Sequence, residues 1–119
     1  MALSQFGLRE EMSGANIAYP ANTYSSIYTN NIRKSGNVAT INFNAALSGT
    51  LAGSGAVVCT LPEGYRPSSS SIIGIYTTYG GGSTKEFYTG TLSTNGNITT
   101  NIGSLTISGS VRIQTTIIL

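Results

Sequence analysis

An alternation of apolar and polar residues within Val38–Leu47 constrains the fold of this chain more than any other sequence feature. The odd positions from Ala39 to Leu47 are all apolar, and the even positions between them are mostly Thr and Asn. Successive side chains of a β-strand point to opposite faces, whereas a helix repeats every 3.6 residues. The segment is therefore predicted to be a strand with one buried and one solvated face.

Similar β patterns, rich in Ile, Val, Thr and Tyr, recur along the chain. Turn residues separate them at intervals of roughly ten residues, which is typical of an all-β sandwich or barrel. Asn95-Gly96 predicts a type I′ hairpin turn, in which both central residues have positive φ. The segment 98–107 is expected to be either continuous or broken at Gly103, and Ser108-Gly109-Ser110 is expected to be a turn. The further expected strands are 23–33, 56–61, 71–79, 87–92 and 111–118.

The first 22 residues differ from the rest. They contain a weak helical stripe, formed by Leu3, Phe6, Leu8 and Met12, and Ser13-Gly14 would end such a helix. A turn or linker is expected over 19–22. The chain is therefore divided into a helical or irregular stem, 1–22, and a β head domain, 23–119. Gly/Ser-rich loops are expected at 48–55 and 80–83.

The chain has few charges. Charged residues make up 8% of the 119 residues, against about 25% in an average soluble domain. The net charge is +2, and the six basic residues are scattered. Because nucleic-acid sites and polybasic membrane sites need a basic cluster, neither partner is expected. Missing carboxylates, rather than surplus Lys and Arg, explain the basic balance.

Cys59 is the only cysteine, so no intrachain disulfide is expected. It lies in the apolar run 56–61 and is interpreted as a buried thiol. The first residues lack the charged and apolar regions of a signal peptide. No apolar stretch approaches the about 18 residues of a membrane span. We therefore expect a protein made in the cytoplasm without standard export, as a virion component would be.

The groups that handle protons in most enzymes are missing. There is no His or Asp, and the carboxylates are Glu10, Glu11, Glu63 and Glu86. A Ser-His-Asp triad is impossible, and a zinc or calcium site is not expected. Glu63 and Glu86 are the only separated pair for glycoside hydrolysis. We interpret them as a solvated turn residue and a partner of Lys85. The sequence therefore predicts a non-enzyme without metal or cofactor.

Binding through tyrosine is the remaining chemistry. Seven Tyr and no Trp are present, and Tyr combines an apolar ring with a polar tip that suits interfaces and stacking. Tyr76, Tyr79 and Tyr88 lie on either side of the glycine loop and are the candidate ligand-binding residues. A face of Tyr, Thr and Asn with few charges would suit a neutral sugar. The alternative is that these rings pack at the core edge or between subunits.

Three motifs occur in order along the chain: KSGNVATI at 34–41, TLPEGYRP at 60–67 and LSTNGNI at 92–98. This series resembles the C-terminal head domain of bacteriophage tail-fibre and baseplate receptor-binding proteins, especially those with Gram-positive hosts. The resemblance covers residues 24–119. It implies an antiparallel, jelly-roll-like β-sandwich. Tyr65 and the prolines of the central motif match its scaffold, and no binding residue is transferred.

The same resemblance implies a homotrimer in the virion, joined to other tail or baseplate proteins. Its expected ligand is a host cell-wall polysaccharide or another surface receptor. A threefold interface would also cover uncharged strand faces. Three alternatives stay open: a purely structural trimerisation tip, a bacterial carbohydrate-binding module or adhesin, and, least favoured, a hydrolase using Glu63 and Glu86.

Overall fold

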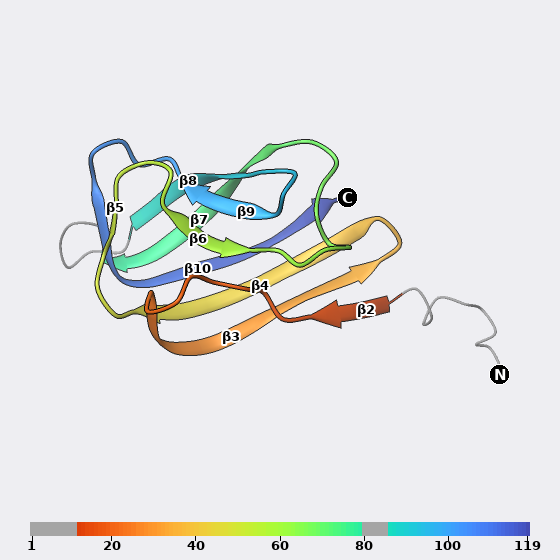
Figure 1. Ribbon diagram of the computed structural model, residues 1–119, viewed down its shortest axis with the longest axis horizontal. Helices are drawn as coiled ribbons and strands as arrows, with labels where there is room; N and C mark the ends of the chain where they lie inside the picture. The colour runs from red at the N-terminus through yellow and green to blue at the C-terminus, as the bar shows by residue number, and fades with distance from the viewer. Residues whose placement is uncertain (1–11, 80–85) are drawn as a thin grey trace.

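The computed structural model describes residues 12–79 and 86–119, which form nine β-strands and no helix (Figure 1). All the strand pairs are antiparallel, so the prediction of an all-β antiparallel fold is confirmed. The strands are β2 (Met12–Ala15), β3 (Tyr24–Ser35), β4 (Val38–Leu47), β5 (Leu51–Ala52), β6 (Val57–Thr60), β7 (Ser71–Tyr79), β8 (Glu86–Leu92), β9 (Asn97–Thr100) and β10 (Thr106–Ile118).

The strands form one sheet that curls on itself as a half-barrel. Its order is β2-β3-β4-β10-β7-β8-β9-β6, with β5 paired to β10. In Figure 1 the half made of β2, β3, β4 and β10 faces the half made of β7, β8, β9 and β6. The two ends of the curl meet, because the backbones of Ala18 and Thr60 exchange hydrogen bonds of 3.0 and 2.7 Å. The halves face each other as in a sandwich, while β10 keeps them in one continuous ladder.

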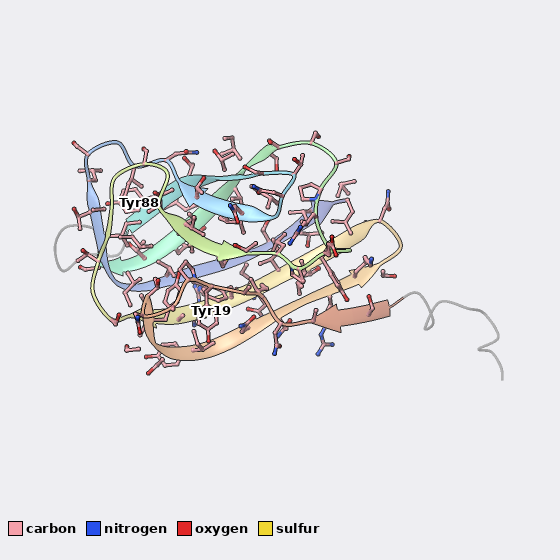
Figure 2. All side chains as sticks on the ribbon, viewed as in Figure 1. Tyr19 and Tyr88 are labelled. Carbon is pink, nitrogen blue, oxygen red and sulfur yellow. The ribbon has the colours of Figure 1, made fainter. Side chains whose placement is uncertain are left out.

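The hydrophobic core fills the space between the two halves. Every apolar residue from Ala39 to Ala45 at the alternating positions of β4 is fully buried, so the pattern that predicted this strand is confirmed. Tyr24 closes the core at one side: its ring centroid lies 5.4 Å from that of Phe43, and its hydroxyl donates to the carbonyl oxygen of Val58 at 2.7 Å. Figure 2 shows Tyr19 beside β3 and β4, and Tyr88 on β8 in the opposite half.

The last strand is longer than the pattern predicted. Ser108-Gly109-Ser110 is not a turn, because β10 runs through it and pairs with β4 on one side and β7 on the other. Gly109 has a φ of 87°, and the register with β7 shifts between Ser108 and Val111. A glycine with positive φ absorbs such a bulge without breaking the strand. The break instead falls at residues 101–105, around Gly103.

The Asn95-Gly96 hairpin forms, but its turn type was predicted wrongly. Gly96 has a φ of 91°, whereas Asn95 is not among the residues with positive φ. The amide of Gly96 donates to the carbonyl of Ser93 at 2.9 Å, and the amide of Asn97 donates to Oδ1 of Asn95 at 3.0 Å. These bonds are those of an ordinary turn followed by one left-handed glycine, the usual longer hairpin connection.

The segment before β3 adds to the sheet. The helix expected over Leu3 to Met12 falls on residues outside the described part, except for Met12, which begins β2. After β2, the side-chain amide of Asn30 makes two hydrogen bonds with the backbone of Ile17. Its Nδ2 donates to the carbonyl oxygen of Ile17 at 2.9 Å, and its Oδ1 accepts from the amide of Ile17 at 2.6 Å. Ile17 is thereby held in the core, where it is buried.

Candidate functional site

Two aromatic rings stand together on the outer face of the sheet, the face opposite the core. Tyr76 on β7 lies directly across from Phe87 on β8, and the centroids of their rings are 4.9 Å apart at an interplanar angle of 58°. The two residues keep 51% and 55% of their surface exposed. We call this pair the aromatic platform. Two adjoining, solvent-facing rings offer an apolar surface on which a flat ligand can stack.

Gly74 explains why the Phe87 ring lies against β7. A Cβ atom at Gly74 would be 2.7 Å from Cε1 of Phe87 and 3.0 Å from its Cζ. Any other residue would therefore push the ring away from the strand. The glycine thus holds the platform close to the sheet.

Arg112 stands beside the platform. It lies across from Tyr76 on one side and from Asn44 on β4 on the other. Cross-strand neighbours on one face have Cβ atoms about 4.5–5.5 Å apart. The guanidinium is exposed and makes no hydrogen bond or ion pair with the described residues. A cation without a described partner thus borders Tyr76, and the amide of Asn44 lies one strand farther away.

Beyond Arg112, the outer face of β10, β4 and β3 is a polar surface. Its side chains are largely Thr, Asn and Gln, and the hydroxyls of Thr40 and Thr116 lie 3.4 Å apart across two strands. Arg33 and Arg112 supply the only charges among the described strand side chains of this face. The surroundings of the platform are rich in hydrogen-bonding groups and poor in charge.

A groove of about 360 Å³ lies farther along β7, at residues 71–73. It lies where β7 and β10 separate, since their pairing includes no residue beyond Arg112 and Tyr76. Its lining combines hydroxyl groups with exposed isoleucines and includes Ser71, Ile72, Thr116 and Ile118. Ile118 is exposed, whereas its neighbours Ile117 and Leu119 pack against the core.

The three tyrosines singled out by the sequence do not come together. Tyr88 pairs across from Ile75 on the inner face, is half-buried and packs against the core. Tyr76 lies on the opposite face of the same two strands. Tyr79 ends β7, and its side chain lies outside the described part of the structure. Of the three, Tyr76 is the one with an exposed ring in the described structure.

The sequence analysis missed Phe87 and Arg112. One signal for Phe87 was present, because Tyr88 and Leu92 share a face by alternation and Leu92 is apolar, which turns Phe87 outward. No local signal places Arg112 beside Tyr76, since these residues are 36 positions apart in the chain.

The three ordered motifs meet at one end of the molecule. Nζ of Lys34, from the first motif, donates to the carbonyl of Gly64 at 2.6 Å and lies 4.8 Å from the centroid of the Tyr65 ring. The amide of Leu61 donates to the carbonyl of Gly96, from the third motif, at 2.9 Å. Arg66 donates through Nε to the carbonyl of Leu61 at 2.9 Å. We call these contacts the turn cluster.

Tyr65 is buried in this cluster, and its hydroxyl donates to Oγ of Ser13 at 2.9 Å. The prediction that Tyr65 packs as scaffold is confirmed. The turn cluster is thus a packed junction whose polar groups bind one another, and it leaves few of them for a ligand.

The described residues assemble little reactive chemistry. Glu63 is an exposed turn residue, and the side chain of Glu86 lies outside the described part. No group of three or more His, Cys, Asp or Glu side chains comes together within residues 12–79 and 86–119. Burial raises the pKa of the Cys59 thiol to about 12, which keeps it protonated and unreactive at neutral pH.

No helix in the described part of the chain has the length and hydrophobicity of a membrane span. No protein-family model matches the chain, and no curated protein is significantly similar to it. A function is therefore inferred from the exposed side chains of the domain.

Proposed function

We propose that this domain is the receptor-binding head of a bacteriophage tail fibre or baseplate, and that it binds a host cell-surface saccharide without cutting it. The observation on which this depends most is the aromatic platform of Tyr76 and Phe87. Sugar rings present apolar C–H faces that stack on exposed aromatic rings, while their hydroxyl groups bind amides and hydroxyls around them.

The surroundings of the platform support this proposal. Asn44 borders Arg112 on the outer face, and hydroxyls continue along β4, β10 and the groove. The platform also stands on a rigid base, because the strands beneath it pack their other faces into the core. A preorganised surface loses less conformational entropy when a ligand binds.

One observation favours a second function, that of a structural tip in a homotrimer. Val38, Ile72 and Ile118 are large apolar side chains exposed on the outer face, and Ile118 lies across from Val38. A neighbouring subunit would bury them. In that case the outer face is an interface between copies, and Tyr76 contacts a subunit instead of a sugar.

Binding to purified cell walls separates the two functions. The oligomer, verified by its mass in solution, should bind saturably to walls from at least one member of a panel of Gram-positive bacteria. Tyr76→Ala should weaken this binding by about 1–2 kcal/mol, as expected for loss of a central aromatic contact, and leave the oligomer intact.

Tyr28→Ala is the matched control, because Tyr28 is exposed on β3, away from the platform. It should bind as the unchanged protein does. Loss of the oligomer on Tyr76→Ala would support the structural tip instead. No saturable binding to any wall of the panel would contradict the receptor-binding function.

A further inference from the structure

The charges of the outer face are of one sign. In the described strands, this face has Arg33 and Arg112 and no carboxylate side chain. Every other described side chain around the platform is uncharged. Among the described side chains of this face, a ligand therefore meets positive charge alone.

Arg112 is the arginine that such a ligand would contact. It is the cross-strand neighbour of Tyr76, whereas Arg33 lies on β3, across from Thr40. Its guanidinium has no acceptor among the described residues. A guanidinium presents a planar fork of N–H donors that matches the two oxygens of a carboxylate or phosphate.

The exposed guanidinium of Arg112 is solvated in the unbound protein. Stacking a sugar on the platform removes solvent near Arg112, which costs free energy unless the ligand supplies an acceptor. An anionic group one bond or two from the stacked ring would provide that acceptor. A neutral sugar would offer hydroxyl groups alone, which form weaker bonds with a guanidinium.

We infer that the ligand of this surface is an anionic saccharide, whose ring stacks on Tyr76 and Phe87 and whose carboxylate or phosphate binds Arg112. This inference rests on the proposed saccharide-binding function and deepens it by naming the charge class of the ligand. It also revises the expectation of a neutral sugar, which was based on the low charge of the chain.

Three soluble probes test the inference by calorimetry or interferometry. They are polygalacturonate, its carboxyl-reduced form, and poly(glycerol phosphate) teichoic acid. The first two differ only in the carboxylate, and the third tests phosphate as the source of charge. At least one anionic probe should bind with an affinity at least about tenfold higher than that of the carboxyl-reduced polymer.

Arg112→Gln should remove that preference and lower the affinity for the anionic probe about tenfold. Arg112→Lys should restore part of it, because the charge remains but the fork of donors is lost. Arg33→Gln is the matched control: it removes the same charge from the same face and should change the affinity less than about twofold. Thermal melting should be unchanged in all three variants, since both arginines are exposed.

A salt series gives a second measurement that needs no variant. Binding of the anionic probe should weaken as NaCl rises from about 0.05 M to about 0.5 M, because the Debye length shortens. Binding of the carboxyl-reduced polymer that is as tight as that of the tighter anionic probe, or equal losses in Arg33→Gln and Arg112→Gln, would overturn the inference. So would failure of both anionic probes. The proposed saccharide-binding function is contradicted only if the cell-wall assay is also negative.

Discussion

The two faces of β7 and β8 differ although they are made by alternating residues of the same strands. On the inner face, Ile75 and Tyr88 lie opposite each other and pack into the core. On the outer face, their sequence neighbours Tyr76 and Phe87 pair with each other and stay half in solvent. The difference teaches that core packing and an exposed aromatic surface are separable here, one residue apart along the chain.

The turn cluster resembles the inner face, because its side chains contact other protein groups. Its groups bind one another across the three motifs, through the contacts of Lys34, Leu61 and Arg66. The aromatic platform has ring contacts, and Arg112 beside it has no hydrogen-bonded partner in the part of the chain that the structure describes. Changes on the packed side should therefore alter unfolding, and changes on the outer face should alter binding.

Gly96→Val should have the largest effect on stability. A Cβ at Gly96 would be 2.6 Å from the carbonyl oxygen of Leu61 and 2.7 Å from Nε of Arg66, and the backbone has a φ of 91°. Strain and overpacking together should cost about 2–5 kcal/mol in urea unfolding. Gly36→Ala is the control: its φ is also positive, at 61°, but the space is open, so about 1 kcal/mol is expected. Equal losses would show that the cluster adds nothing.

Tyr88→Ala should destabilise the protein and spare the outer face. Removing a half-buried ring from the core edge should lower the free energy of unfolding by about 2–3 kcal/mol. Tyr76→Ala, in the same pair of strands, should change it by less than about 0.5 kcal/mol. If both variants lost the same stability, the separation between the faces would be wrong.

Two buried threonines allow a comparison between a hydroxyl with hydrogen bonds and one without a described partner. Oγ1 of Thr100 donates to the carbonyl of Gly53 at 2.7 Å and accepts from the amide of Ala56 at 3.1 Å. The Thr77 hydroxyl is buried and has no hydrogen-bond partner among the described residues. Thr100→Val should therefore cost about 1–3 kcal/mol, since it leaves two backbone groups unpaired, whereas Thr77→Val should be neutral or stabilising. Chemical unfolding of both variants measures this, and the reverse order would contradict the assigned bonds.

Phe87→Ala should weaken saccharide binding by about 1 kcal/mol, because one ring of the platform is lost while Tyr76 remains. Melting should not change, since more than half of the Phe87 side chain is exposed. Leu105→Ala offers a control, as Leu105 is exposed to a similar degree outside this face. The affinity of each variant for cell walls gives the readout, and a weaker effect at Phe87 than at Leu105 would place the ligand elsewhere.

The last effect is one of pH, and it is absent at neutral pH. Burial raises the pKa of Cys59 to about 12, and burial, with the nearby thiolate charge second, raises the pKa of Tyr24. The unfolded chain therefore releases these protons at lower pH than the folded protein does. Stability is fully present below the thiol's unfolded pKa and falls as pH rises from about 9 toward 12.

Urea unfolding at pH 7, 9 and 10.5 should show this fall. Cys59→Ala should be less stable at pH 7 but should lose less stability as the pH rises. A stability that stays constant up to pH 10.5 would contradict the burial of both groups.

Local patterns predicted the strands well where a strand has one buried face. The alternation of β4 and the apolar run of β6 needed only their own residues to be recognised. Predictions of turns from the sequence were wrong where glycines with positive φ occur both in turns and in bulges within strands. Gly109 bulges within a strand while Gly96 ends a turn, and both have positive φ. The sequence alone does not distinguish them, because the distinction depends on which strands lie alongside.

The sequence by itself determined that this chain forms an antiparallel β fold with one buried and one open face, since alternation and turn residues act over a few positions. It also marked Tyr76, with Tyr79 and Tyr88, as a candidate ligand-binding residue. Only the tertiary structure decided that Phe87 and Arg112 stand beside Tyr76 and that Tyr88 does not. The physical reason is that contacts between distant residues depend on strand order and register, and a shift of one residue would exchange the two faces.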